Sequence, residues 1–257
     1  MKRTILFLSL LLTLFGIVSC DKRDAEHIPN ILETYVEPKE DFYLIIEYSK
    51  DLDRSPQDMY VTVVSKSKLL SLKLNETEIP IRYFNYLDSS GAYLYDFDTY
   101  ALEEDVIGDY DEYLSYQIIL ENQTIADSLL VPAEYSSELA EFDPNQDYTF
   151  TWSLGTNPKI QSIRLELETT NGDDFYYEKE INAGKRSYTF SKSLWDHMGT
   201  TELDSVEMLA GNYAHIQGGV VWLLSSGEHY VWNWDKSEQR HRERIMDLIN
   251  NRISLPD

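Results

Sequence analysis

The chain has 257 residues, with 22 Lys and Arg against 45 Asp and Glu, so its formal net charge at pH 7 is −23. A charge of this size and sign repels nucleic acid and anionic membrane surfaces, which excludes both as partners of the folded surface. Hydrophobic residues make up 42% of the chain, and it holds 19 tyrosines, whereas disordered chains are poor in aromatic residues. We therefore expect an acidic, folded protein.

The first 19 residues have the pattern of a signal peptide. Lys2 and Arg3 give a positive start, and residues 5–18 are almost wholly apolar. This run is long enough for the apolar region of a signal but shorter than the roughly 20 residues that a spanning helix needs. We predict that residues 1–19 are removed from the mature protein.

The signal ends at Ile17-Val18-Ser19-Cys20, which places a small residue before the single cysteine of the chain. This sequence resembles the lipobox of bacterial envelope lipoproteins. The resemblance implies that the Cys20 thiol carries diacylglycerol, with palmitate as a typical acyl group. Two or three acyl chains make such an attachment effectively permanent. The alternative is an ordinary secretory signal with a chance cysteine.

The segment after the cysteine is predicted to be a tether. Residues 21–24 resemble the charged residues that follow the lipid anchor in lipoproteins of the Bacteroidota, which implies a cell envelope and favours the outer membrane over the inner one. Residues 20–39 are polar and carry Pro29 and Pro38. We expect this segment to hold a folded body off the membrane.

In residues 40–132 apolar side chains recur at every second position, as in Phe42, Leu44 and Ile46. Half-buried strands have this period. The same alternation occurs in further runs at 70–74, 79–83 and 116–120, and another strand is expected over the run 124–131. The polar residues 121–123 separate the last two runs and predict a hairpin there. We predict a first antiparallel β-sandwich over 40–132.

Residues 133–235 show the same alternation of apolar and polar side chains, in Tyr148-Thr-Phe-Thr-Trp152, Ser162-Ile-Arg-Leu-Glu-Leu-Glu168 and Ser187-Tyr-Thr-Phe190. These runs resemble the immunoglobulin-like and fibronectin type III-like sandwiches of bacterial envelope lipoproteins, although the cysteine pair of that pattern is missing. The resemblance implies that Trp152 is a core residue. The expected fold class is thus all-β, with two antiparallel β-sandwich modules and a short C-terminal α-helix.

Residues 218–234 predict an aromatic hairpin. A strand at 220–224, a turn near Gly227 and a second strand at 229–234 would place Tyr230, Trp232 and Trp234 on one strand face. An aromatic row of this kind either binds a ligand by stacking or packs inward as core. We favour the inward ladder and keep the three residues as ligand-binding candidates.

Residues 236–257 contain the one segment whose pattern is helical. Ile245, Leu248 and Ile249 form an apolar stripe within 236–252, and several arginines make the segment basic. We predict that this helix docks on the acidic body rather than remaining a free tail.

Acidic residues crowd between Asp96 and Glu112, which raises the question of a calcium site, since calcium takes six to eight oxygen ligands. The EF-hand spacing fails, with Ala101 and Ile107 where Gly and Glu are required. We expect no cofactor and keep calcium as the alternative. Its candidate ligands are Asp96, Asp98, Glu104, Asp105, Asp109 and Asp111.

No sequence motif of a nucleophile elbow, a phosphate-binding loop or a zinc site occurs, so we expect no enzymatic activity. The main hypothesis is a membrane-anchored envelope lipoprotein that presents a non-catalytic recognition surface to an envelope protein or a glycan. One alternative is a carbohydrate-active or metal-assisted hydrolase that uses the acidic cluster 96–112. The other is a structural spacer.

Overall fold

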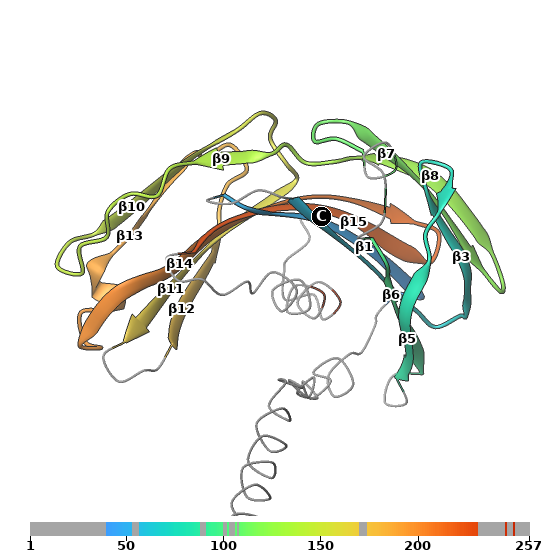
Figure 1. The fold of residues 1–257 in the computed structure, drawn as a ribbon, viewed down its shortest axis with the longest axis horizontal. Helices are drawn as coiled ribbons and strands as arrows, with labels where there is room; N and C mark the ends of the chain where they lie inside the picture. Colours follow the sequence, from blue (N-terminus) through green and yellow to red (C-terminus); the bar gives the residue numbers. More distant parts are fainter. Residues whose placement is uncertain are drawn as a thin grey trace, which may run out of the picture. The chain divides into compact units, whose positions relative to one another are not determined.

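The computed structural model describes residues 40–52, 57–87, 91–99, 102, 106, 108–169, 174–230, 245 and 249. These residues form the strands β1 (Phe42–Asp51), β2 (Gln57–Ser65), β3 (Leu69–Leu74), β4 (Thr77–Glu78), β5 (Ile81–Leu87), β6 (Ala92–Phe97), β7 (Tyr113–Leu120) and β8 (Thr124–Leu130). They continue as β9 (Tyr135–Ser137), β10 (Tyr148–Leu154), β11 (Ile160–Thr169), β12 (Asp174–Glu180), β13 (Ser187–Phe190), the short 3-10 helix η1 (Lys192–Leu194), β14 (Thr200–Ile216) and β15 (Gly219–Tyr230). The all-β prediction is confirmed (Figure 1). No helix in these ranges is long and apolar enough to cross a membrane.

Eight strands form one large sheet in the order β12-β11-β14-β15-β1-β2-β6-β5. A four-stranded sheet, β4-β3-β7-β8, and a three-stranded sheet, β13-β10-β9, complete the described strands. Figure 1 shows the four-stranded sheet over one half of the large sheet and the three-stranded sheet over the other half. The predicted hairpin at 121–123 is confirmed, because β7 and β8 pair antiparallel across it.

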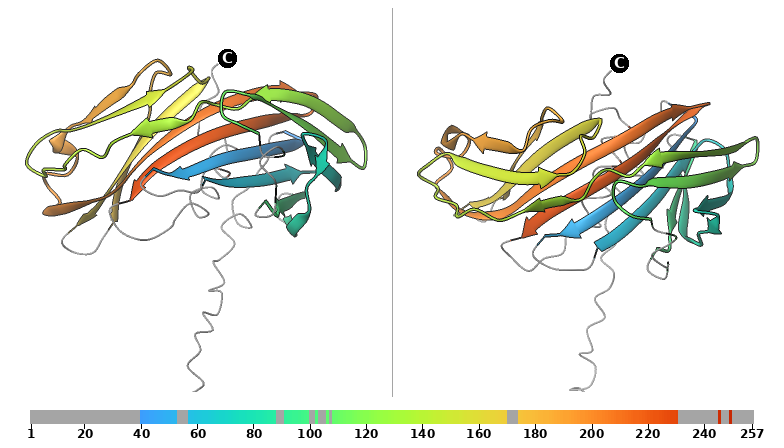
Figure 2. Two further views of the ribbon diagram at one scale, coloured as in Figure 1. Left: turned by 45° about the horizontal axis from the view of Figure 1, so that its top comes forward. Right: turned by 90° about the horizontal axis from the view of Figure 1, so that it is seen from above.

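The centre of the large sheet is a parallel pair of β1 and β15, which runs from Phe42 beside Gly219 to Asp51 beside Glu228. Figure 2 shows these two strands side by side, although they lie near opposite ends of the chain. The other flank of β15 pairs antiparallel with β14 through the tight turn at Gln217 and Gly218, where Gly218 has a φ of 80°. Glycine adopts this left-handed conformation without strain.

The predicted turn near Gly227 is wrong, because β15 continues without a break through Ser225, Ser226 and Gly227. The physical reason is that both flanks of this stretch are paired, with β1 on one side and β14 on the other. A paired backbone keeps its hydrogen bonds and has no cause to turn. The hairpin is instead formed by β14 and β15.

Two separate cores fill the spaces between the sheets. The first core packs β1, β2 and β6 against β3 and β7, with Leu72, Tyr116 and Ile118 among its fully buried members. The second packs β11 and β14 against β10 and β13, and it contains Trp152 and Trp195. The burial of Trp152, which is 5% exposed, confirms its prediction as a core residue.

The two cores fall largely within the predicted modules 40–132 and 133–235, but the large sheet runs through both. β15 belongs to the second range, yet Val221 and Leu223 on this strand pack in the first core. A period-two pattern identifies a strand and not its neighbour, so this connection was not visible in the sequence.

The second face of the large sheet is also buried, at Tyr43, Ile45, Trp222 and Leu224 among others. Of the helix predicted over 236–252, the structure describes only Ile245 and Ile249, which are 1% and 0% exposed. Leu248 and the basic residues lie outside the described part of the chain, so the helix itself stays a prediction.

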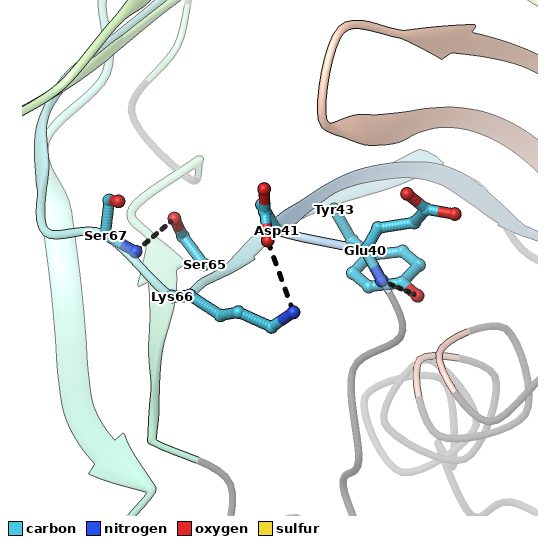
Figure 3. A network of polar contacts seen from close by, with 6 residues as sticks. All are labelled: Glu40, Asp41, Tyr43, Ser65, Lys66 and Ser67. Atoms are coloured by element: carbon cyan, nitrogen blue, oxygen red, sulfur yellow. Dashed lines mark hydrogen bonds and ion pairs between the residues drawn. The ribbon is translucent and has the colours of Figure 1, made fainter.

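The start of β1 is fixed by several polar contacts (Figure 3). The Glu40 amide donates a hydrogen bond to the Tyr43 hydroxyl at 3.1 Å, and the Lys66 ammonium lies 3.2 Å from the Asp41 carboxylate. The Asp41 amide also donates to the Gly218 carbonyl at 2.9 Å. The chain therefore enters the sheet at a defined point, and the predicted tether 20–39 lies outside the described residues.

Candidate recognition edge

Two of the acidic residues predicted as metal ligands accept hydrogen bonds from threonine hydroxyls. The Asp96 carboxylate accepts a hydrogen bond from the Thr62 hydroxyl at 2.8 Å, and the Asp111 carboxylate accepts one from Thr156 at 2.5 Å. Glu104 and Asp105 lie outside the described residues. Within the described ranges, no three His, Cys, Asp or Glu side chains come together in a way that could hold a metal ion. Asp98 and Asp109 lie in the same ranges and join no such group.

The other sequence candidates lie wholly or partly outside the described residues. Tyr230 ends β15 with its backbone beside Ser205, but its side chain and the whole of Trp232 and Trp234 lie outside the described part of the chain. Cys20 lies outside it as well. The choice between an aromatic ladder and a ligand platform stays a prediction.

The large sheet carries several buried carboxylates. Glu47, Glu207 and Glu228 are all 5% exposed or less. Ser226 donates a hydrogen bond to Glu47 at 2.7 Å, and Glu207 lies in register between Arg164 and Glu228. Because these groups are covered, a ligand cannot reach them in this state of the molecule. We interpret the row as part of the structure and not as an open site.

A serine–histidine pair joins β9 to β15. The Ser137 hydroxyl lies 2.8 Å from His229 Nε2, and the imidazole meets the Phe150 ring nearly edge-on at 5.8 Å. His229 is only 2% exposed. A general base must reach the proton that it removes from a bound substrate, so a ring embedded in the core is better suited to holding β9 against the large sheet.

Among the described residues, exposed large apolar and aromatic side chains are most frequent on β5, at one end of the large sheet. Ile81, Tyr83, Phe84 and Tyr86 are 44%, 47%, 56% and 47% exposed. Phe84 and Tyr86 lie on one face of this seven-residue strand and Tyr83 lies on the other, so large side chains are exposed on both sides of the edge. Exposed apolar groups gathered in this way mark interaction sites more often than scattered single residues do. We name β5, together with the neighbouring side chains of β6, the aromatic edge.

The rings of the aromatic edge are held in place by the first core. Phe84 stacks on Tyr95 at 5.7 Å with 20° between the planes, and Tyr86 meets Tyr93 at 4.9 Å. Tyr95 is 3% exposed, and its hydroxyl accepts a hydrogen bond from the Leu69 amide at 3.0 Å. Burial raises the pKa of Tyr95, so this ring stays neutral at physiological pH. The exposed rings of Phe84 and Tyr86 therefore pack against the β6 side chains Tyr95 and Tyr93, which pack in the first core.

The opposite end of the large sheet, at β12, carries more charged residues than β5. β12 carries Asp174, Glu178, Lys179 and Glu180, and its one exposed aromatic residue is Tyr176. Charged residues on an edge strand discourage pairing with other chains. β5 has one charged residue, Arg82, and is not protected in this way.

The aromatic edge was missed in the sequence, although its strand was partly predicted at 79–83. The signal was present as Tyr83, Phe84 and Tyr86 in one strand of low charge. What the sequence lacks is the position of β5 at the end of the sheet, which follows from pairing between distant segments. The chain matches no protein-family model and no curated protein sequence.

Proposed function

We propose that this protein is a bacterial envelope lipoprotein, anchored through lipid at Cys20, whose β domain presents a non-catalytic recognition surface to an envelope protein or a glycan. The observation that carries the proposal is the aromatic edge, with four exposed large side chains on β5. Rigid, exposed aromatic residues are typical anchors of recognition surfaces, because they bury much area at a small entropic cost. The immunoglobulin-like or fibronectin type III-like character of the two halves rests on their strand signatures.

The anchor is tested by Cys20→Ala. No other thiol is available for the thioether, so the variant should leave the membrane fraction and appear in the soluble envelope fraction. The measurement is fractionation of cells that produce the variant or the wild type. Equal membrane retention of both proteins would rule out lipid attachment at this residue.

The recognition surface is tested by the double variant Phe84→Ser and Tyr86→Ser, with Tyr176→Ser on β12 as the matched control. Envelope proteins and glycans that bind the wild type are purified, and their affinities are measured for all three proteins. We expect binding to be lost in the β5 variant and kept in the control. Equal binding by all three would refute the aromatic edge as the surface. The same preparations are also assayed for glycan cleavage, which would support the hydrolase alternative. Absence of binding to any envelope protein or glycan would support the spacer alternative.

A further inference from the structure

We infer that the aromatic edge binds an extended segment of another protein by strand addition, so that the segment becomes a ninth strand of the large sheet. This inference rests on the proposed function and names the class of its partner. In strand addition, main-chain hydrogen bonds to a sheet edge supply affinity, while alternate side chains supply specificity.

The position of β5 provides the backbone for such a partner. β5 pairs with β6 from Tyr83 to Leu87, and it is the last strand on its side of the described sheet. Since a strand directs backbone groups to both sides, the side of β5 away from β6 can accept another strand. The register shift between Ile81 and Tyr83 limits the regular edge to its second part. A segment of about five residues matches that length.

The side chains of β5 favour a peptide over a glycan. Phe84 and Tyr86 stand on the face of the first core, against Tyr95 and Tyr93. Tyr83 pairs with Asp96 and stands on the other face of the sheet. An added strand alternates its side chains, so it can contact Phe84 and Tyr86 on one face and Tyr83 on the other, whereas a sugar stacked on Phe84 and Tyr86 would leave Tyr83 unused.

The negative charge of the chain favours a different protein over a second copy of this one as the partner of β5. The full chain has a formal charge of −23, and the predicted loss of Lys2 and Arg3 with the signal makes the mature protein more acidic still, so repulsion between two copies opposes pairing of their edges. Asp96 and Asp98 lie next to the edge on and after β6. The favoured partner is therefore an extended segment with apolar residues at alternate positions and basic residues between them.

The test uses the mature lipid-free protein with residues 20–257, carrying Cys20→Ser, and random ten-residue peptides displayed on phage. A selected peptide is synthesised in three forms: unmodified, N-methylated at odd positions and N-methylated at even positions. N-methylation removes the amide donor, and only every second donor of an added strand points at the edge. We expect one methylated form to bind at least about tenfold more weakly and the other to bind like the unmodified peptide.

The protein variants supply the second readout. Phe84→Ser with Tyr86→Ser should weaken the peptide by about tenfold or more, while Tyr176→Ser should leave its affinity unchanged. Circular dichroism melts check that all variants are folded. The methylated peptides need no change in the protein, so they keep the test valid if the double variant unfolds.

Three results would overturn strand addition. The first is equal binding of both methylated forms. The second is binding of oligosaccharides that the β5 variant loses while no peptide binds, which would leave the proposed function intact. The third is a dimer, seen by sedimentation velocity, that the β5 variant abolishes. Failure of the proposed function itself is distinct, because then neither peptide, envelope protein nor glycan would depend on β5.

Discussion

Among single residues, Trp152 is one of two tryptophans that fill the second core. Trp152 lies on β10, is 5% exposed, and its ring lies 6.3 Å from that of Phe150 with 22° between the planes. Replacing a buried tryptophan by alanine removes its transfer free energy and leaves a cavity, so Trp152→Ala should lower the free energy of unfolding by about 3–5 kcal/mol. Urea denaturation measures the change. Tyr113→Ala, at a residue 71% exposed, is the control that should change it by less than about 0.5 kcal/mol.

A second residue, Gly219, lies where β15 begins beside the start of β1. A Cβ at Gly219 would lie 2.5 Å from the carbonyl oxygen and the ring of Phe42 on the neighbouring strand. The backbone oxygen cannot move aside without disturbing the parallel pair of β1 and β15. We expect Gly219→Ala to cost about 1–3 kcal/mol in thermal or urea unfolding, as overpacking does. Gly184→Ala is the matched control, because its close neighbour is only the Asn182 side chain.

At the level of elements, the predicted C-terminal helix is expected to stabilise the folded body of the protein. Ile245 and Ile249 are buried, and each such side chain stabilises by roughly 1.5–3 kcal/mol. Deleting residues 236–257 should therefore lower the melting temperature by roughly 6 °C or more for a domain of this size. Ile249→Ala is the milder variant, and it should shift the melting temperature in the same direction. Rapid amide exchange at residues 245 and 249 of the intact protein would contradict docking.

The elements that could be predicted from the sequence are those with a clear period of two. β10, with the sequence Tyr-Thr-Phe-Thr-Trp-Ser-Leu, alternates buried and exposed side chains along its whole length as expected. β15 could not be read as one strand, because Ser225, Ser226 and Gly227 are typical of turns and are held extended only by β1 and β14. Pairing with two distant strands therefore outweighs the turn propensity of these three residues.

The candidate site was less predictable than the strands. Asp96 and Asp111 are charges in a crowded run of the sequence, yet each one accepts a hydrogen bond from a threonine of a distant segment, Thr62 and Thr156 respectively. The aromatic edge has an ordinary strand sequence, and it becomes a candidate interaction surface only because β5 lies at the end of the large sheet. That position depends on pairings between segments distant in sequence, such as β1 with β15, which a local pattern cannot specify.

At the scale of the whole molecule, the large sheet should make the two cores unfold together. β15 pairs with β1 over ten residues and with β14 over twelve, and its Val221 and Leu223 pack in the first core. Loss of either core would therefore expose part of a strand on which the other depends. Such sharing favours a single cooperative transition.

Leu72→Ala tests this coupling, because Leu72 is 1% exposed in the first core on β3 of the four-stranded sheet, whereas β11 belongs to the large sheet and packs in the second core. The substitution should cost about 2–5 kcal/mol, as buried leucine-to-alanine changes do. If the sheet unfolds as one unit, amide exchange under conditions of global unfolding should accelerate in β11 by the same factor as in β3 and β7. Exchange followed by mass spectrometry of peptides from these strands gives both values in one experiment. Acceleration confined to β3 and β7 would show two independent modules with a boundary near residue 132, and the parallel pair of β1 and β15 would then be a contact that opens before either core unfolds.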